Sequence, residues 1–192
     1  MVTAAQRGQE VRQRLLRAAA ELIVERGWTA VTTRVLAQRA GVAPGLVHYH
    51  FTSVQALLVE AAVEVARSVA AQTAPVLAGA DSADEALTTL LGMFDTADGT
   101  DPTSVLFVEA YLAATRDERL RQALGEMLGQ FRRQLADCLA THAVADPDAT
   151  AAVLAAAIDG VLLHRALAAG PHGGALAAVL RRLVTAGPEG AR

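Results

Sequence analysis

The segment from Thr32 to Phe51, TTRVLAQRAGVAPGLVHYHF, constrains the fold more than any other part of this chain. It predicts a short helix, a tight turn at Gly41 and a second short helix that carries His48, Tyr49 and His50. Two helices of this length cannot form a core alone. Their close connection is typical of a helix-turn-helix, in which the first helix positions the second for the major groove of DNA.

The composition of the whole chain favours an all-α fold. Of the 192 residues, 53% are hydrophobic but only 4% are aromatic, so the core must consist mainly of aliphatic and alanine side chains. Alanine is the best helix former, and no stretch alternates apolar and polar residues for long enough to predict a sheet. We expect about nine helices, of which the first three, in residues 1–52, form a DNA-binding head, and the others form a larger helical domain in residues 53–192.

Apolar stripes, caps and proline positions predict the helix limits. The first helix is expected from about residue 9 to 26, before Gly27, with Trp28 packed at the junction that follows. Thr32 or Thr33 caps the second helix, and Pro44 opens the third. Later helices are expected at 53–72 before Pro75, 82–95, 103–115, 117–142 and 147–169, with a ninth after Gly174.

The second short helix carries the side chains best suited to contact nucleic acid. Its spacing turns Val47 and Phe51 inward, and His48 and Tyr49 offer ring nitrogens and a hydroxyl to phosphate or base edges, as does the ring of His50. The alternative is a solvated helix face, with His50 partly in the core. A metal site is disfavoured because side chains at i and i+2 of a helix point apart.

The charge distribution supports a nucleic-acid partner. Through Gln55 the chain has seven arginines and three acidic residues, a net charge of +4. The remaining segment has ten arginines and seventeen acidic residues, a net charge of −7. A basic head suits a phosphate-facing surface, and an acidic remainder would help to orient the encounter with DNA. The alternative is chance segregation of surface charge.

Several other function classes are disfavoured. The single cysteine, Cys138, excludes a disulfide framework and a cysteine-rich zinc site, and a reducing cytoplasmic setting fits. The apolar segment 151–169 is interrupted by Asp159, His164 and Arg165, which argues against a membrane span. No nucleophile–base–acid set, phosphate loop or metal-ligand spacing is found. We therefore expect neither an enzyme nor a bound cofactor.

The first ~60 residues resemble the TetR family of bacterial transcriptional regulators. The resemblance is carried by RLLRAAAELIVERGWTAVTTRVLAQRAGVAPGLVHYHFTSVQALL, from Arg14 to Leu58. It implies a homodimer with one DNA-binding head per subunit, a small-molecule pocket in the larger domain, and a dimer interface built from the last two helices. The DNA-contacting positions that it implies are Thr33, Arg34, Gly45, Leu46, His48, Tyr49 and His50.

The sequence lacks two cationic residues that are common in the family pattern. Ala43 and Pro44 stand where the family often has a Ser-Lys pair, and Val54 stands where a lysine is common. Each missing phosphate contact would lower the salt dependence of binding by about one unit. The arginines that could compensate are Arg7, Arg12, Arg14 and Arg34.

The larger domain offers candidates for an effector site and for a dimer interface. Glu109, Asp159 and His164 lie within apolar stripes, where each would either orient a ligand or hydrogen-bond at the dimer interface. Small residues in the eighth helix and the stripe of the ninth favour an interface over a closed monomer core. The aromatic and methionine side chains that could line a pocket, or simply fill the core, are Met93, Phe94, Phe107, Tyr111, Met127 and Phe131.

Together these features predict a cytoplasmic, homodimeric repressor that binds a pseudo-palindromic DNA operator and is released by a small-molecule effector of unknown identity. The alternative is a regulator of the same kind without an inducer pocket, which a protein partner controls or which acts constitutively.

Overall fold

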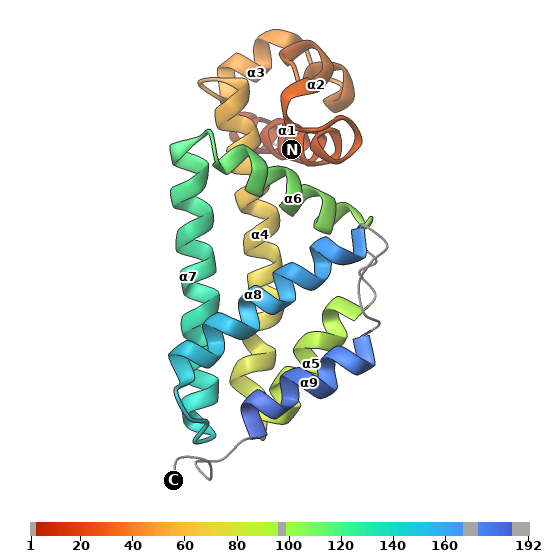
Figure 1. Ribbon diagram of the computed structural model, residues 1–192. Coiled ribbons are helices and arrows are strands. Elements are labelled where there is room, and N and C mark those ends of the chain that lie inside the picture. The colour runs from red at the N-terminus through yellow and green to blue at the C-terminus, as the bar shows by residue number, and fades with distance from the viewer. Residues whose placement is uncertain (1–2, 96–98, 167–172, 186–192) are drawn as a thin grey trace. The chain divides into compact units, whose positions relative to one another are not determined.

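The computed structural model describes residues 3–95, 99–166 and 173–185. Within these ranges the chain forms nine α-helices, one short 3-10 helix and no strand, which confirms the expected all-α fold (Figure 1). The elements are α1 Ala4–Arg26, η1 Trp28–Ala30, α2 Thr33–Ala40, α3 Pro44–His50, α4 Val54–Gly79, α5 Ala83–Asp95, α6 Pro102–Ala114, α7 Glu118–Thr141, α8 Pro147–Ala166 and α9 Gly173–Thr185.

The helices pack into two compact units. The first comprises residues 1–66 and 105–124, and the second comprises residues 67–104 and 125–192. Helices α4, α6 and α7 each begin in one unit and end in the other. The domain boundary expected between residues 52 and 53 stays a prediction.

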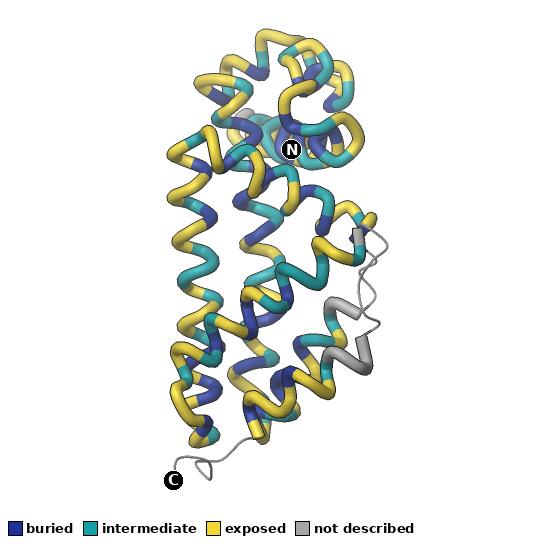
Figure 2. Tube along the Cα trace, viewed as in Figure 1, coloured by how far each residue is buried: buried dark blue, intermediate teal, exposed yellow. Residues whose placement is uncertain are grey.

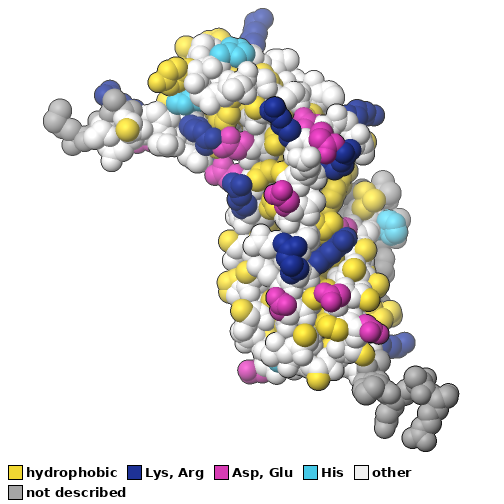
Figure 3. Space-filling view, turned by 90° about the vertical axis from the view of Figure 1, so that its left-hand side faces the viewer, with side chains coloured by type: hydrophobic (Ala, Val, Ile, Leu, Met, Phe, Trp, Pro, Cys, Tyr) yellow, Lys and Arg dark blue, Asp and Glu magenta, His cyan; other side chains and the backbone are white. Residues whose placement is uncertain are grey.

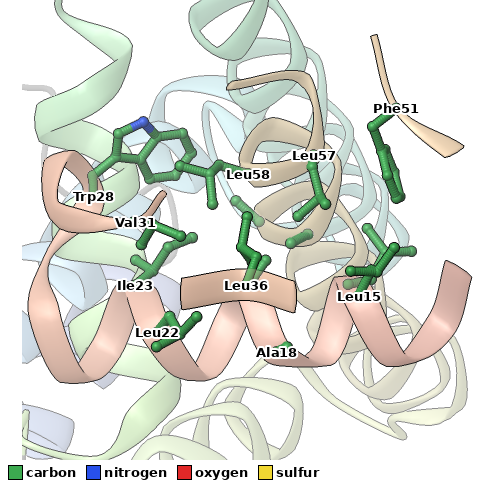
Figure 4. Close-up of a cluster of buried hydrophobic side chains, with 14 of the residues drawn as sticks. Leu15, Ala18, Leu22, Ile23, Trp28, Val31, Leu36, Phe51, Leu57 and Leu58 are labelled. Atoms are coloured by element: carbon green, nitrogen blue, oxygen red, sulfur yellow. The ribbon is translucent and has the colours of Figure 1, made fainter. Parts of the chain in front are cut away.

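The core of the first unit is aliphatic, as the composition requires. The apolar stripe of α1 packs against α2, α4 and Trp28, which lies 6% exposed in η1 (Figure 4). Each buried leucine or isoleucine side chain contributes about 1.5–3 kcal/mol of transfer free energy. The fully buried large side chains of this core include Leu15, Leu22, Ile23, Leu36, Leu57 and Leu58.

Helix α1 begins five residues earlier than its apolar stripe predicts. The expected start near residue 9 is wrong because Thr3 and Gln6 form a capping box. The Gln6 N–H donates to Thr3 Oγ1 at 3.2 Å, and the Thr3 N–H donates to Gln6 Oε1 at 2.7 Å. The cap satisfies backbone donors at the helix start, so the helix needs no apolar residues there to begin.

Helix α4 continues through Pro75 to Gly79, so the expected end near residue 72 is also wrong. A proline inside a helix removes one backbone hydrogen bond and crowds the preceding turn. Here Pro75 is exposed and lies only four residues before the helix ends.

The second unit has its own core, formed by α5, α7, α8 and α9 (Figure 2). Helix α9 packs along α5, and Arg181 of α9 donates to both carboxylate oxygens of Asp84 on α5, with the Nη2–Oδ2 distance 2.6 Å. These hydrogen bonds lower the pKa of Asp84. The fully buried leucines of this core are Leu87, Leu90, Leu135, Leu139 and Leu154.

Candidate nucleic-acid interface

Helices α2 and α3 and the turn between them form a helix-turn-helix. The Thr32 side chain accepts from the Val35 N–H at the start of α2. At its end, Gly41 adopts φ 64° and ψ 42°, the left-handed conformation that favours glycine. The Val42 N–H then donates to the Ala37 carbonyl at 3.0 Å, which closes the turn and directs the chain into α3.

Helix α3 is anchored on one side and open on the other. Val47 is 0% exposed and Phe51 is 5% exposed, which confirms their predicted inward orientation. Tyr49, by contrast, is 80% exposed, and His48 lies exposed beside it. Two buried anchors at i and i+4 thus fix the helix while its outer side chains remain accessible to a partner.

The predicted contact residues differ in how accessible they are. Arg34, Gly45, His48 and Tyr49 are exposed, whereas Thr33, Leu46 and His50 are half-buried. A Cβ built on Gly45 would meet no atom within 4 Å, so the space beside it is open for the approach of a ligand backbone. DNA contact by each of these residues stays a prediction.

His50 is covered by its neighbours rather than directed outward. Its ring packs edge-to-face against Tyr49, with the centroids 5.0 Å apart and the planes at 88°. A Cβ built on Gly8 of α1 would also lie 3.9 Å from His50 Cε1. The start of α1 therefore lies against the C-terminal end of α3.

Two arginines of the head form ion pairs with carboxylates, and the other arginines are exposed. Arg12 pairs with Glu60 and lies over the Phe51 ring, 5.0 Å from its centroid. Arg39 donates to Glu25 at 2.8 Å and to Glu21 at 3.1 Å, which lowers the pKa of the Glu25 carboxyl. These two arginines join helices of the head. The exposed ones are Arg7, Arg14, Arg17, Arg26 and Arg34.

Trp28 is held by two hydrogen bonds that the sequence did not predict. Glu109 of α6 accepts from the backbone N–H of Trp28 at 2.8 Å, and the Trp28 indole Nε1 donates to Gln55 Oε1 at 2.9 Å. Glu109 is thus bound within the first unit, a third role beside the two that the sequence left open. The signal was its position as the one charged residue of the apolar helix α6, but the partner is 81 residues away.

The effector-site candidates do not belong to one unit. Phe131 packs against the core of the second unit. Met93 and Met127 also belong to the second unit, whereas Phe107 and Tyr111 belong to the first unit. The side chain of Phe94 lies outside the described residues. These positions stay a prediction. In the part of the chain that the structure describes, no three His, Cys, Asp or Glu residues gather as metal ligands would.

Helices α8 and α9 expose large apolar side chains on the second unit: Val153, Leu163, Val179 and Leu183 are each 41–54% exposed. The 147–165 segment of α8 is long and apolar enough to cross a membrane, by length and composition alone. The same segment contains the half-buried Asp159 and the exposed His164. An apolar surface of this kind favours contact with another molecule.

Comparison with known proteins agrees with the geometry of the head. Residues 15–61 match the family model described as bacterial regulatory proteins, tetR family, and residues 79–186 match the model described as tetracyclin repressor-like, C-terminal domain. An uncharacterized HTH-type transcriptional regulator of Mycobacterium tuberculosis is 32% identical over 139 residues, which cover 70% of this chain and 69% of that protein.

Two solved structures are similar over most of their length. A candidate transcriptional regulator from Streptomyces coelicolor is 35% identical with a TM-score of 0.75, covering 92% of this chain and 99% of its own. The multidrug binding protein EbrR, complexed with imidazole, is 32% identical with a TM-score of 0.69, covering 93% and 97%. The chain belongs to the TetR family and is a DNA-binding transcriptional regulator, not an enzyme.

Proposed function

We propose that this chain is a cytoplasmic repressor that binds a pseudo-palindromic operator as a homodimer and is released by a small-molecule effector. The observation that carries the proposal is the outer face of α3, where His48 and Tyr49 stand exposed on the buried anchors Val47 and Phe51. Helix α3 enters the major groove, and its exposed side chains contact base edges and the neighbouring backbone.

Each predicted contact residue takes a role that its exposure allows. Tyr49 and His48, both exposed on α3, read the groove, while Gly45 permits close approach of the DNA backbone. Arg34 and Thr33, at the start of α2, contact phosphates. The half-buried Leu46 and His50 lie at the edge of the interface.

The operator is tested by selection from random duplex DNA with the full chain, followed by footprinting. Two-fold related half-sites with centres about 34–36 Å apart, or a multiple of that spacing, are the expected result, because a symmetric dimer presents two copies of α3. Selection of a single unrepeated half-site would contradict the dimeric mode of binding.

A second copy of this chain covers the apolar side chains of α8 and α9. Family membership favours this partner, and a two-fold interface lets the same apolar patch serve both subunits. Sedimentation of the wild-type chain should give a dimer, and Val153→Glu together with Val179→Glu should give a monomer that retains its helical circular dichroism. A wild-type monomer that associates with lipid vesicles would instead assign this surface to a membrane.

Release by an effector follows from linkage between two sites. A ligand that favours a wider separation of the two α3 helices weakens operator binding by the same coupling free energy with which DNA weakens ligand binding. Gln134 Oε1 on α7 is a buried acceptor that has no hydrogen-bond partner among the described residues. It lies three residues after Phe131, so an effector with a donor group would satisfy it next to one of the predicted lining residues.

Release by an effector is tested by a screen for small molecules that dissociate the protein from a fluorescently labelled operator duplex. The similarity to the multidrug binding protein EbrR, complexed with imidazole, makes imidazole and larger aromatic amines the first compounds to use. A releasing compound should lose potency in a Gln134→Leu variant that binds operator normally. Failure of a broad library to release the operator would favour the second candidate, a regulator controlled by a protein partner or constitutive.

A further inference from the structure

The start of α1 is a feature that the helix-turn-helix does not require. Residues 4–14 precede the first fully buried side chain of α1, Leu15, and also precede the segment that matches the family model, which begins at residue 15. They nevertheless continue the helix, because the Thr3 and Gln6 capping box closes its first turn. At 1.5 Å per residue they add about 16 Å of helix to the head.

This extension lies next to the recognition helix. Gly8 lies beside the His50 ring, and His50 packs against Tyr49. One side chain therefore separates the first turns of α1 from Tyr49, which is 80% exposed on α3. In Figure 3 these turns extend from the head toward the left of the view, with dark-blue cationic side chains on and beside them and histidines in cyan nearby.

The extension also carries a cation that the head does not use for its own packing. Arg12 is held by Glu60 and Phe51, so it is not available to DNA without loss of these contacts. Arg7 is exposed, directly precedes Gly8, and its side chain forms no ion pair or hydrogen bond within the described part of the chain. Arg14 follows seven residues later, two turns along the same face.

We propose that Arg7 contacts a backbone phosphate of the operator next to the groove that α3 enters. The inference rests on the proposed function and adds to it a contact outside the helix-turn-helix. A guanidinium one residue from the α1–α3 contact supplies charge beside the recognition helix, where the missing cations at Pro44 and Val54 leave few others. Because a phosphate contact does not read sequence, Arg7 should raise affinity without changing base preference.

The test compares Arg7→Gln with Arg26→Gln by fluorescence anisotropy on the selected operator between 50 and 300 mM salt. Arg26 is an exposed arginine of the same helix, 19 residues and about 28 Å further along it, so it controls for net charge. Arg7→Gln should flatten the plot of log Kobs against log[salt] by about 0.9 per subunit and weaken binding about fivefold per contact at 0.15 M salt. Arg7→Lys should restore most of the slope.

Replacement of single phosphates by an uncharged analogue gives a second readout, which locates the contact on the DNA. Replacing the phosphates that flank each half-site one at a time by methylphosphonate should weaken the wild-type protein at one position and leave Arg7→Gln insensitive there. Equal slopes for Arg7→Gln and Arg26→Gln, with no such position, would overturn the proposal while Tyr49→Ala still weakened binding. If the wild-type chain selected no duplex at all, the proposed function would fail first.

Discussion

Glu109 provides a direct test of how the head is held together. Its carboxylate accepts from the Trp28 N–H at 2.8 Å, and Trp28 is a buried side chain of the first core. A hydrogen bond to a charged acceptor contributes about 1.5–3 kcal/mol, and an unpaired buried N–H costs a similar amount. Glu109→Ala should therefore lower the free energy of unfolding of the first unit by about 1.5–3 kcal/mol.

Glu109→Gln serves as the matched variant. Its amide oxygen can still accept from Trp28, but a neutral hydrogen bond is about half as strong as a charged one, so we expect a loss of about 1 kcal/mol. Urea unfolding followed by the fluorescence of Trp28, the only tryptophan, measures both losses at one fixed protein concentration. Amide hydrogen exchange at Trp28 gives the local readout and should accelerate in the order wild type, Gln, Ala.

The reasoning would be refuted by a Glu109→Ala variant whose urea midpoint and Trp28 amide exchange both equal those of the wild type. A loss of stability without faster exchange at Trp28 would also contradict it, because the effect would then arise elsewhere than at this hydrogen bond.

Three further predictions concern backbone and charge. Gly27→Ala should destabilise the chain by about 1–3 kcal/mol in urea unfolding, because φ 79° and ψ 159° suit only glycine; an unchanged midpoint would contradict this. Gly8→Ala should instead raise stability by about 0.5–1 kcal/mol, since the added Cβ meets His50 at an ordinary 3.9 Å; destabilisation would show a tighter α1–α3 contact. Arg181 lowers the pKa of Asp84, so Asp84→Asn should lower the melting temperature at pH 7, and the difference should persist down to the ordinary pKa of 3.8 and vanish as the pH falls through the lowered pKa of the folded state; a difference independent of pH would argue against this ion pair.

The helix-turn-helix could be predicted from the sequence because its signals lie within the segment itself. Gly41 marks a turn that needs a left-handed residue, Pro44 marks a helix start, and the spacing of Val47 and Phe51 defines the buried side of α3. Each of these signals acts within a few residues. That is why they predict the structure without knowledge of the remaining fold.

Features that depend on contacts distant in the sequence were not predicted. The partner of Glu109 lies 81 residues away, and the partner of Arg12 lies 48 residues away. Periodicity cannot show that one arginine is held by a carboxylate while Arg7 is exposed. Nor can it place His50 between α1 and Tyr49, because that contact depends on how two helices cross.

The most direct test of DNA recognition by α3 is the affinity of His48→Ala and Tyr49→Ala for the selected operator, measured by anisotropy at fixed salt. Both side chains are exposed, so the variants should keep the wild-type circular dichroism and dimerisation. We predict that each loses about 1–3 kcal/mol of discrimination between the operator and a scrambled duplex, which corresponds to a change of roughly fivefold to 150-fold in the ratio of Kd values. Operator affinity and discrimination equal to the wild type in both variants would contradict the assignment of α3 as the recognition helix.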